Sequence, residues 1–169
     1  MKLLFKITNK LLSSVRADLV RSHEFAAERV GFLSCRFGAL SNDGLVILAC
    51  AYHPIEDADY VENQGYGALM GSEAIRKALY YTYRHSVGMF HIHIHGHYGG
   101  PRFSRIDENE ARKFVPHFFH ARNTAPHGAI ILSLDSACGF CWLPGAIQSA
   151  GLVAQATLCF DMEHALQYR

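Results

Sequence analysis

The chain of 169 residues is half hydrophobic and 18% charged, which is the size and composition of one globular domain covering residues 1–169. Its formal net charge of +1 gives no global electrostatic attraction to nucleic acid or to a membrane, and no run of about 18 apolar residues suggests a transmembrane helix. The first residues lack the features of a signal peptide and the five cysteines form no repeating framework, so a reducing cytoplasm is favoured.

The first half of the chain predicts one helix, two strands and a loop. Apolar side chains recur at helical spacing through residues 8–29, with charged residues between them. Residues 30–37 and 44–52 are typical of strands, and a turn sequence, Ser-Asn-Asp-Gly, joins them at residues 41–44. Residues 54–71 are polar, acidic and punctuated by glycines, so they predict a long surface loop.

The second half predicts two more helices and four strands. Ser72 and Ser104 are suited to cap helices that end near His85 and His120, because an acidic residue follows in the first turn of each helix. The last predicted strand is also compatible with the start of a C-terminal helix. Because helices and strands alternate without the rhythm of a doubly wound sheet, we predict an α/β or α+β fold with a mixed sheet flanked by helices. The predicted strands cover residues 87–95, 129–134, 139–143 and 152–160.

Histidines alternate along one of these strands. The sequence reads His-Ile-His-Ile-His-Gly-His from His91 to His97, and side chains two residues apart in a strand point to the same face. Four imidazoles on one face do not form an ordinary hydrophobic core, because each carries a polar nitrogen that needs a partner. An isolated His-x-His pair is more often a surface or hydrogen-bonded pair, but four alternating histidines favour a metal ion. Imidazole suits zinc, and Asp107, a short loop later, would supply an oxygen ligand.

The segments around this strand resemble the JAMM metalloproteases, also called the JAB or MPN-plus family. The signature of that family is a glutamate before a strand, a His-x-His pair, and Ser-x-x-Asp after a short loop rich in glycine and proline. Here Glu28 opens the sequence Glu-Arg-Val-Gly-Phe-Leu, glycines and a proline follow the histidines, and Ser104 and Asp107 complete Ser-x-x-Asp. The resemblance covers residues 28–107, and it implies the mixed-sheet architecture shared by MPN domains and cytidine deaminases.

The chain departs from the family pattern after the histidine pair, where the family usually has proline. With His93 and His95 as the pair, Gly96 takes that position and the loop to the serine is slightly long. With His95 and His97 as the pair, Tyr98 takes it and the loop is slightly short. We favour His93 with His95, because Gly96 can end the strand directly after the pair and leave His97 in the loop.

The resemblance also implies a role for each residue. Two histidines and Asp107 would bind one zinc ion per chain and leave a fourth position for water, as in catalytic zinc sites. Glu28 would act as general base and acid, and Ser104 would donate a hydrogen bond to the developing oxyanion. Each residue also has a purely structural interpretation. Glu28 would lie in the last exposed turn of its helix, Ser104 would only cap a helix, and Asp107 would only interact with the helix dipole.

Members of the family hydrolyse amide bonds, commonly the isopeptide bond after the C-terminal glycine of a ubiquitin-like protein, and others trim precursors of such proteins. The resemblance therefore implies a prokaryotic stand-alone isopeptidase or peptidase with E1-like and E2-like partners, as in antiphage defence systems, and no nucleic-acid or membrane partner. The acidic residues 56–62 could meet a basic surface on the modifier or could simply be solvated. Two alternatives are a catalytically silent MPN-type scaffold and a histidine-rich metal-binding protein.

Overall fold

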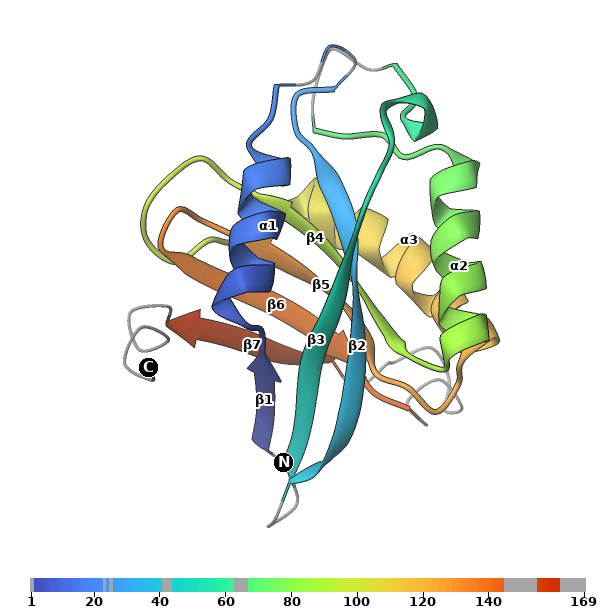
Figure 1. Ribbon diagram of the computed structural model, residues 1–169. Helices are drawn as coiled ribbons and strands as arrows, with labels where there is room; N and C mark the ends of the chain where they lie inside the picture. The colour runs from blue at the N-terminus through green and yellow to red at the C-terminus, as the bar shows by residue number, and fades with distance from the viewer. Residues whose placement is uncertain are drawn as a thin grey trace.

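The computed structural model describes residues 2–22, 24, 26–40, 44–62, 67–144 and 155–161 of the chain (Figure 1). In chain order the elements are β1 (Lys2–Lys6), α1 (Asn9–Leu19), β2 (Val30–Leu40), β3 (Gly44–Pro54), the 3-10 helix η1 (Asp57–Asp59), α2 (Ser72–His85), β4 (Gly88–Ile94), α3 (Arg105–Ala121), β5 (His127–Leu132), β6 (Ser136–Trp142) and β7 (Gln155–Asp161). The fold is α+β, with a mixed sheet flanked by helices, as the sequence predicts.

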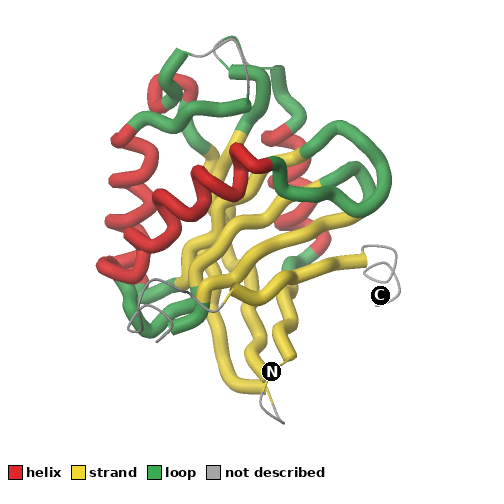
Figure 2. The backbone as a smooth tube through the Cα atoms, turned by 180° about the vertical axis from the view of Figure 1, so that it is seen from behind, coloured by secondary structure: helices red, strands yellow, loops and turns green. Residues whose placement is uncertain are grey.

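The strands form one sheet of seven, in the order β1-β3-β2-β4-β5-β6-β7. β1 with β3 and β4 with β5 are parallel pairs, and the other neighbours are antiparallel. The edge strands β1 and β7 also contact each other, so the sheet is curled. One face carries α1 and the other carries α2 and α3 (Figure 1, Figure 2). Among the described residues, no helix combines the length and the apolar character needed to span a membrane.

Alternation along β4 directs its side chains into two different cores. Phe90 and Ile92 pack with α1 in one core, whereas Met89 packs with α2 and α3 in the other. Because a shift by one residue would exchange the two faces of the strand, both cores together fix the register of β4. His91 and His93 consequently lie on the same face as Met89, toward α2 and α3.

The first helix is shorter than predicted. The Thr8 hydroxyl caps α1 by accepting a backbone hydrogen bond (3.3 Å), and the helix stops at Leu19, so the prediction of a longer helix is wrong beyond that point. The carbonyls of residues 21 and 22 accept hydrogen bonds from the Arg29 guanidinium instead of from helical amides (3.2–3.4 Å). Glu28 therefore lies in a bend before β2 and not in the last turn of a helix.

The two later helices begin in different ways. Ser104 caps α3 as predicted, and it forms a reciprocal capping box with Asp107. The prediction that Ser72 caps α2 is wrong, because the N-cap is Gly71 and Ser72 is the first helical residue. Gly71 donates its N–H to the carbonyl of Asp59 (2.8 Å), and a Cβ at this glycine would come within 2.9 Å of that oxygen. A close backbone approach thus takes the place of a side-chain cap at α2.

The predicted strands are present, with bounds that differ at their ends. β1 is an additional strand, and its five residues show no alternation that would predict it. The turn at residues 41–43 lies outside the described residues. The prediction of a surface loop for residues 54–71 is wrong in part, because the segment contains η1 and buries Ile55, Asp59 and Tyr60.

Candidate metal centre

His93 and His95 meet at the end of β4. Their Nε2 atoms lie 3.2 Å apart. His93 lies on the strand and is 3% exposed, whereas His95 directly follows β4 and donates its backbone N–H to the carbonyl of Leu132 (2.8 Å). Burial is the main cause that lowers the pKa of His93, so its imidazole is held in the neutral form. The neutral form is the one that binds metal ions.

Asp107 faces both histidines from the first turn of α3. Its Oδ1 lies 3.6 Å from Nε2 of His93, and its Oδ2 lies 4.0 Å from Nε2 of His95. Oδ2 also accepts the N–H of Ser104 (2.8 Å), and the Asp107 N–H donates to the Ser104 hydroxyl oxygen (3.1 Å). The capping box therefore orients the carboxylate with Oδ1 toward His93, and the Ser104 hydroxyl keeps its own proton to donate.

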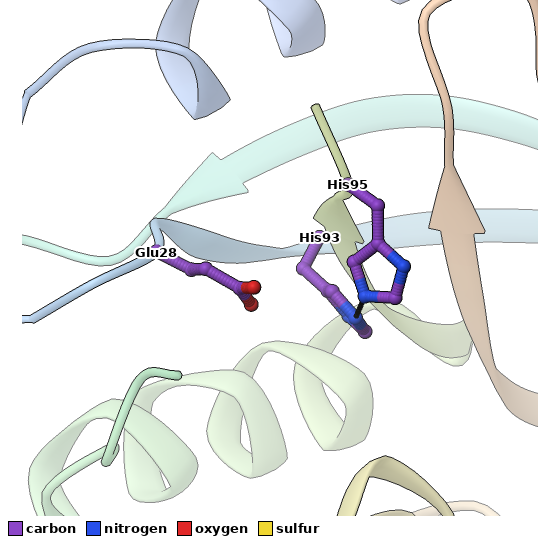
Figure 3. A group of neighbouring side chains, drawn as sticks. All are labelled: Glu28, His93 and His95. Atoms are coloured by element: carbon purple, nitrogen blue, oxygen red, sulfur yellow. Dashed lines mark hydrogen bonds between the residues drawn. The ribbon is translucent and has the colours of Figure 1, made fainter. Parts of the chain in front are cut away.

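Glu28 reaches the histidines from the bend before β2. β2 and β4 are antiparallel, and their pairing ends at Val30 and His93. Glu28 precedes Val30 by two residues and His95 follows His93 by two, so both lie just beyond the same end of the paired strands. A carboxylate oxygen of Glu28 and one ring nitrogen from each histidine lie within 4.8 Å of one another, and the carboxylate points toward the pair (Figure 3). These three residues form a group that could hold a metal ion, with Asp107 beside it.

Burial shifts the titration of this glutamate. Removal from water raises the pKa of the Glu28 carboxyl above its ordinary value, the neighbouring His95 lowers it, and the Asp107 carboxylate raises it. The shift is upward, because desolvation of the charged form is the largest of these effects. A carboxyl group with a raised pKa is better suited to accept and return a proton near neutral pH than a fully solvated one.

The other two histidines of the motif lie outside this group. His97 is in the loop after β4, where it is exposed and its Nδ1 lies 2.9 Å from the carbonyl of Tyr98. His91 is on the same face as His93, and its ring packs edge-on against Phe32 and Phe114. Burial lowers the pKa of His91 to about 3, so this imidazole is neutral. The register with His93 and His95 is thus the one whose side chains meet.

Two buried ring nitrogens at the site make no hydrogen bond with the described residues. They are Nε2 of His91 and Nδ1 of His93. A histidine that binds a metal usually donates its second ring N–H to a carboxylate, a carbonyl or a water molecule. The described residues provide no such partner for Nδ1 of His93.

The candidate site opens into a cavity of about 500 Å³. Glu28, His93, His95, Ser104 and Asp107 all line it, so every residue that the sequence motif selects is brought to one place. The rest of the wall is mainly apolar and is drawn from β2, β4, β5, α2, α3 and the segments before the two helices. Sequence reasoning did not select these wall residues, because apolar side chains in such elements look like ordinary core residues. The apolar wall includes Val30, Leu69, Met70, Ile75, Phe103, Ile106 and Phe114.

Comparison with protein-family models gives no match, and comparison with curated proteins gives none. Among solved structures, the chain is similar to the N-terminal domain of STIL from Trichoplax adhaerens, with 12% sequence identity and a TM-score of 0.37. The match covers 82% of this chain and 41% of that chain, so the present chain spans about two fifths of that protein chain's length. A similarity of this strength carries no argument about fold or function.

Proposed function

We propose that this chain is a zinc-dependent hydrolase, a metallopeptidase of the JAMM type with one zinc ion per chain. The observation that carries the proposal is the convergence of Glu28, His93, His95 and Asp107 on one cavity, from two strand ends and a helix start. Two histidines and one aspartate are a ligand set of the kind found in catalytic zinc sites. A nearby carboxylate outside that set is what a hydrolase needs to move protons.

The distances fit a tetrahedral zinc ion. Zn–N bonds of about 2.0–2.1 Å at the tetrahedral angle would separate two ligand nitrogens by about 3.3 Å, and Zn–O bonds of similar length give a similar N–O separation. The two Nε2 atoms are 3.2 Å apart, and Asp107 Oδ1 is 3.6 Å from the nearer one. A single N–H···N hydrogen bond would also bring two imidazoles to this distance. That bond alone would not explain why both rings turn toward the same carboxylate.

The residues around the site can then carry out hydrolysis of an amide. Zinc bound there would polarise the scissile carbonyl and lower the pKa of a coordinated water to about 7. Glu28, whose carboxylate lies near both histidines, would accept the proton of the attacking water and return it to the leaving amine. The Ser104 hydroxyl, which accepts the Asp107 N–H and retains its own proton, can donate to the oxyanion.

The substrate class that we propose is a ubiquitin-like modifier, or its conjugate, cleaved after its C-terminal glycine. This follows from the resemblance of Glu28, the histidine pair, Ser104 and Asp107 to the JAMM motif. A glycine tail suits a metal at the end of a sheet, because an extended segment can pair with a strand and a residue without Cβ approaches the wall closely. We place the enzyme in the cytoplasm with E1-like and E2-like proteins, consistent with the free thiols of the buried cysteines.

The test combines metal analysis with cleavage of a glycine-terminated modifier fused to a reporter. The controls are the same fusion with its terminal glycine changed to a bulky residue, and casein. The proposal expects about one zinc per chain and cleavage of the glycine fusion alone. Absence of zinc after purification and reconstitution would contradict the metal centre. Equal cleavage of both fusions, or digestion of casein with neither fusion cut, would contradict the substrate class.

A further inference from the structure

The backbone on both sides of Glu28 is hydrogen-bonded to the segment between β3 and α2. Before Glu28, the N–H of Ala27 donates to the carbonyl of Gly67 (3.0 Å). After it, the Tyr60 hydroxyl accepts the N–H of Val30 (2.9 Å) and donates to the carbonyl of the same residue (3.2 Å). The carboxylate of Glu28 makes no hydrogen bond with the described residues, whereas these contacts hold the backbone on both sides of it.

Arg29, the residue next to Glu28, is part of the same connection. Its side chain is 4% exposed, and one guanidinium nitrogen donates to Asp57 of η1 (2.8 Å). The remaining guanidinium contacts are the carbonyls of residues 21 and 22, after α1. An almost fully buried arginine with this many acceptors is costly to displace, because its charge would lose its partners without regaining water.

The segment that holds Glu28 is itself fixed to α2. Lys77 of α2 donates to Asp59 (2.7 Å) and to Glu56 (3.2 Å). The two limbs of the segment are joined by the N–H of Val61, which donates to the carbonyl of Leu69 (2.9 Å). Glu56, Asp57 and Asp59 thus each have a cationic partner within the chain. Glu56 and Asp57 are nevertheless exposed, as expected for a solvated loop, and a contact of this segment with the modifier stays a prediction.

We propose that Tyr60 is a positioning residue for Glu28. The inference rests on the proposed role of Glu28 as general base. Tyr60 is buried, and its hydroxyl is hydrogen-bonded to both the N–H and the carbonyl of Val30. Val30 is the first residue of β2 and the register partner of His93. The hydroxyl therefore holds the start of β2 in position, two residues after Glu28. The position of this backbone determines how closely Glu28 can approach His95. Displacement of a catalytic group by about 1 Å can cost about 100-fold in rate, so a single remote hydroxyl is sufficient to matter.

The test is Tyr60→Phe, with Tyr52→Phe as its matched control. Tyr52 is a half-buried tyrosine that packs against the core on the α1 side of the sheet, and its hydroxyl donates to Asp18 of α1 (2.7 Å). Tyr60→Phe should keep its zinc and lower kcat about 10- to 100-fold with KM unchanged, since the loss falls on the transition state. Tyr52→Phe should keep the kcat of the wild type.

Two readouts do not depend on hydrolysis. In metal-free protein, the amide of Ala27 should exchange with solvent about tenfold faster in Tyr60→Phe, the fold-change that corresponds to loss of one net hydrogen bond, and not in the control. In cobalt-loaded protein, Tyr60→Phe should change the visible absorption spectrum in the same direction as Glu28→Gln. An unchanged Ala27 exchange rate or an unchanged kcat in zinc-loaded Tyr60→Phe would overturn the positioning role.

The same readouts separate this inference from the proposed function. A wild-type protein that hydrolyses no fusion contradicts the function, and the exchange and cobalt measurements still decide whether Tyr60 positions Glu28. If Tyr60→Phe does not fold, Asp57→Asn takes its place, because the Asp57 side chain is 58% exposed and its change weakens the contact with Arg29. That variant should show smaller changes in the same three readouts, and wild-type values in all of them would overturn the inference.

Discussion

Asp107 has two roles that a pair of substitutions can separate, namely helix capping and metal binding. In Asp107→Asn the amide oxygen can still accept the Ser104 N–H, and only the negative charge near the start of α3 is lost. That charge contributes about 0.3–1 kcal/mol to the free energy of unfolding. Asp107→Ala also removes the acceptor, and loss of such a capping contact costs about 0.5–2 kcal/mol more. Both variants lose the carboxylate that we propose as the third metal ligand.

Urea unfolding of the metal-free proteins and zinc titration measure the two roles independently. We expect Asp107→Asn to be destabilised by at most about 1 kcal/mol and Asp107→Ala by about 1–3 kcal/mol. Zinc affinity should fall by at least about 100-fold in both, which exceeds the usual 10- to 100-fold effect of a group that only supports a ligand. Wild-type zinc affinity in Asp107→Asn would refute Asp107 as a ligand. Equal stability of the two variants would refute the contribution of the capping box.

Three further predictions concern the histidines and Glu28. His95→Ala and His93→Ala should each abolish zinc binding while His97→Ala retains it, and elemental analysis showing the reverse for His93 and His97 would establish the other register. Glu28→Gln should retain zinc, and its kcat should be about 10²–10⁴-fold lower than that of the wild type. Loss of zinc would instead identify Glu28 as a ligand. A kcat above about a tenth of the wild-type value would contradict its role as general base. His127 is 0% exposed and neutral, and burial lowers its pKa to about 4. Because the unfolded chain takes up this proton near pH 6.5, the free energy of unfolding should fall by about 3 kcal/mol as the pH drops from 6.5 to 4. The free energy of unfolding, measured with urea at a series of pH values, should depend less on pH in His127→Gln than in the wild type. An identical pH dependence in the two proteins would contradict this prediction.

The part of the site that could be predicted from the sequence is the part built from neighbouring residues. The alternation of β4 determines which histidines share a face, and the Ser104 cap determines where α3 begins and hence where Asp107 lies. Fewer than about 20 residues separate these groups, so period-two alternation and a capping signal suffice to relate them. Glu28 is different, because its distance from the histidines depends on the pairing of β2 with β4. Only the family resemblance pointed to this residue.

The end of the first helix and the acidic segment differ from the prediction because charged residues there form ion pairs and hydrogen bonds within the chain. The first helix is predicted to continue to residue 29, but the Arg29 guanidinium is buried between Asp57 and the carbonyls after α1. The acidic segment is predicted to be a surface loop because it is polar and contains glycines, and within it Asp59 is buried and pairs with Lys77. Hydrophobic periodicity carries no information about such ion pairs, because their partners lie about 20 or more residues apart in the sequence.

These internal ion pairs also bear on how a modifier would be recognised. Glu56, Asp57 and Asp59 are already paired with Lys77 and Arg29, so a basic partner would have to compete with the contacts around Glu28, the proposed general base. Recognition through those charges would therefore disturb the residue to which we assign proton transfer. The apolar wall of the cavity carries no such penalty, and contact there removes nonpolar surface from water. We therefore expect binding energy for the proposed substrate to come from the wall, while the acidic segment keeps the contacts that we propose position Glu28.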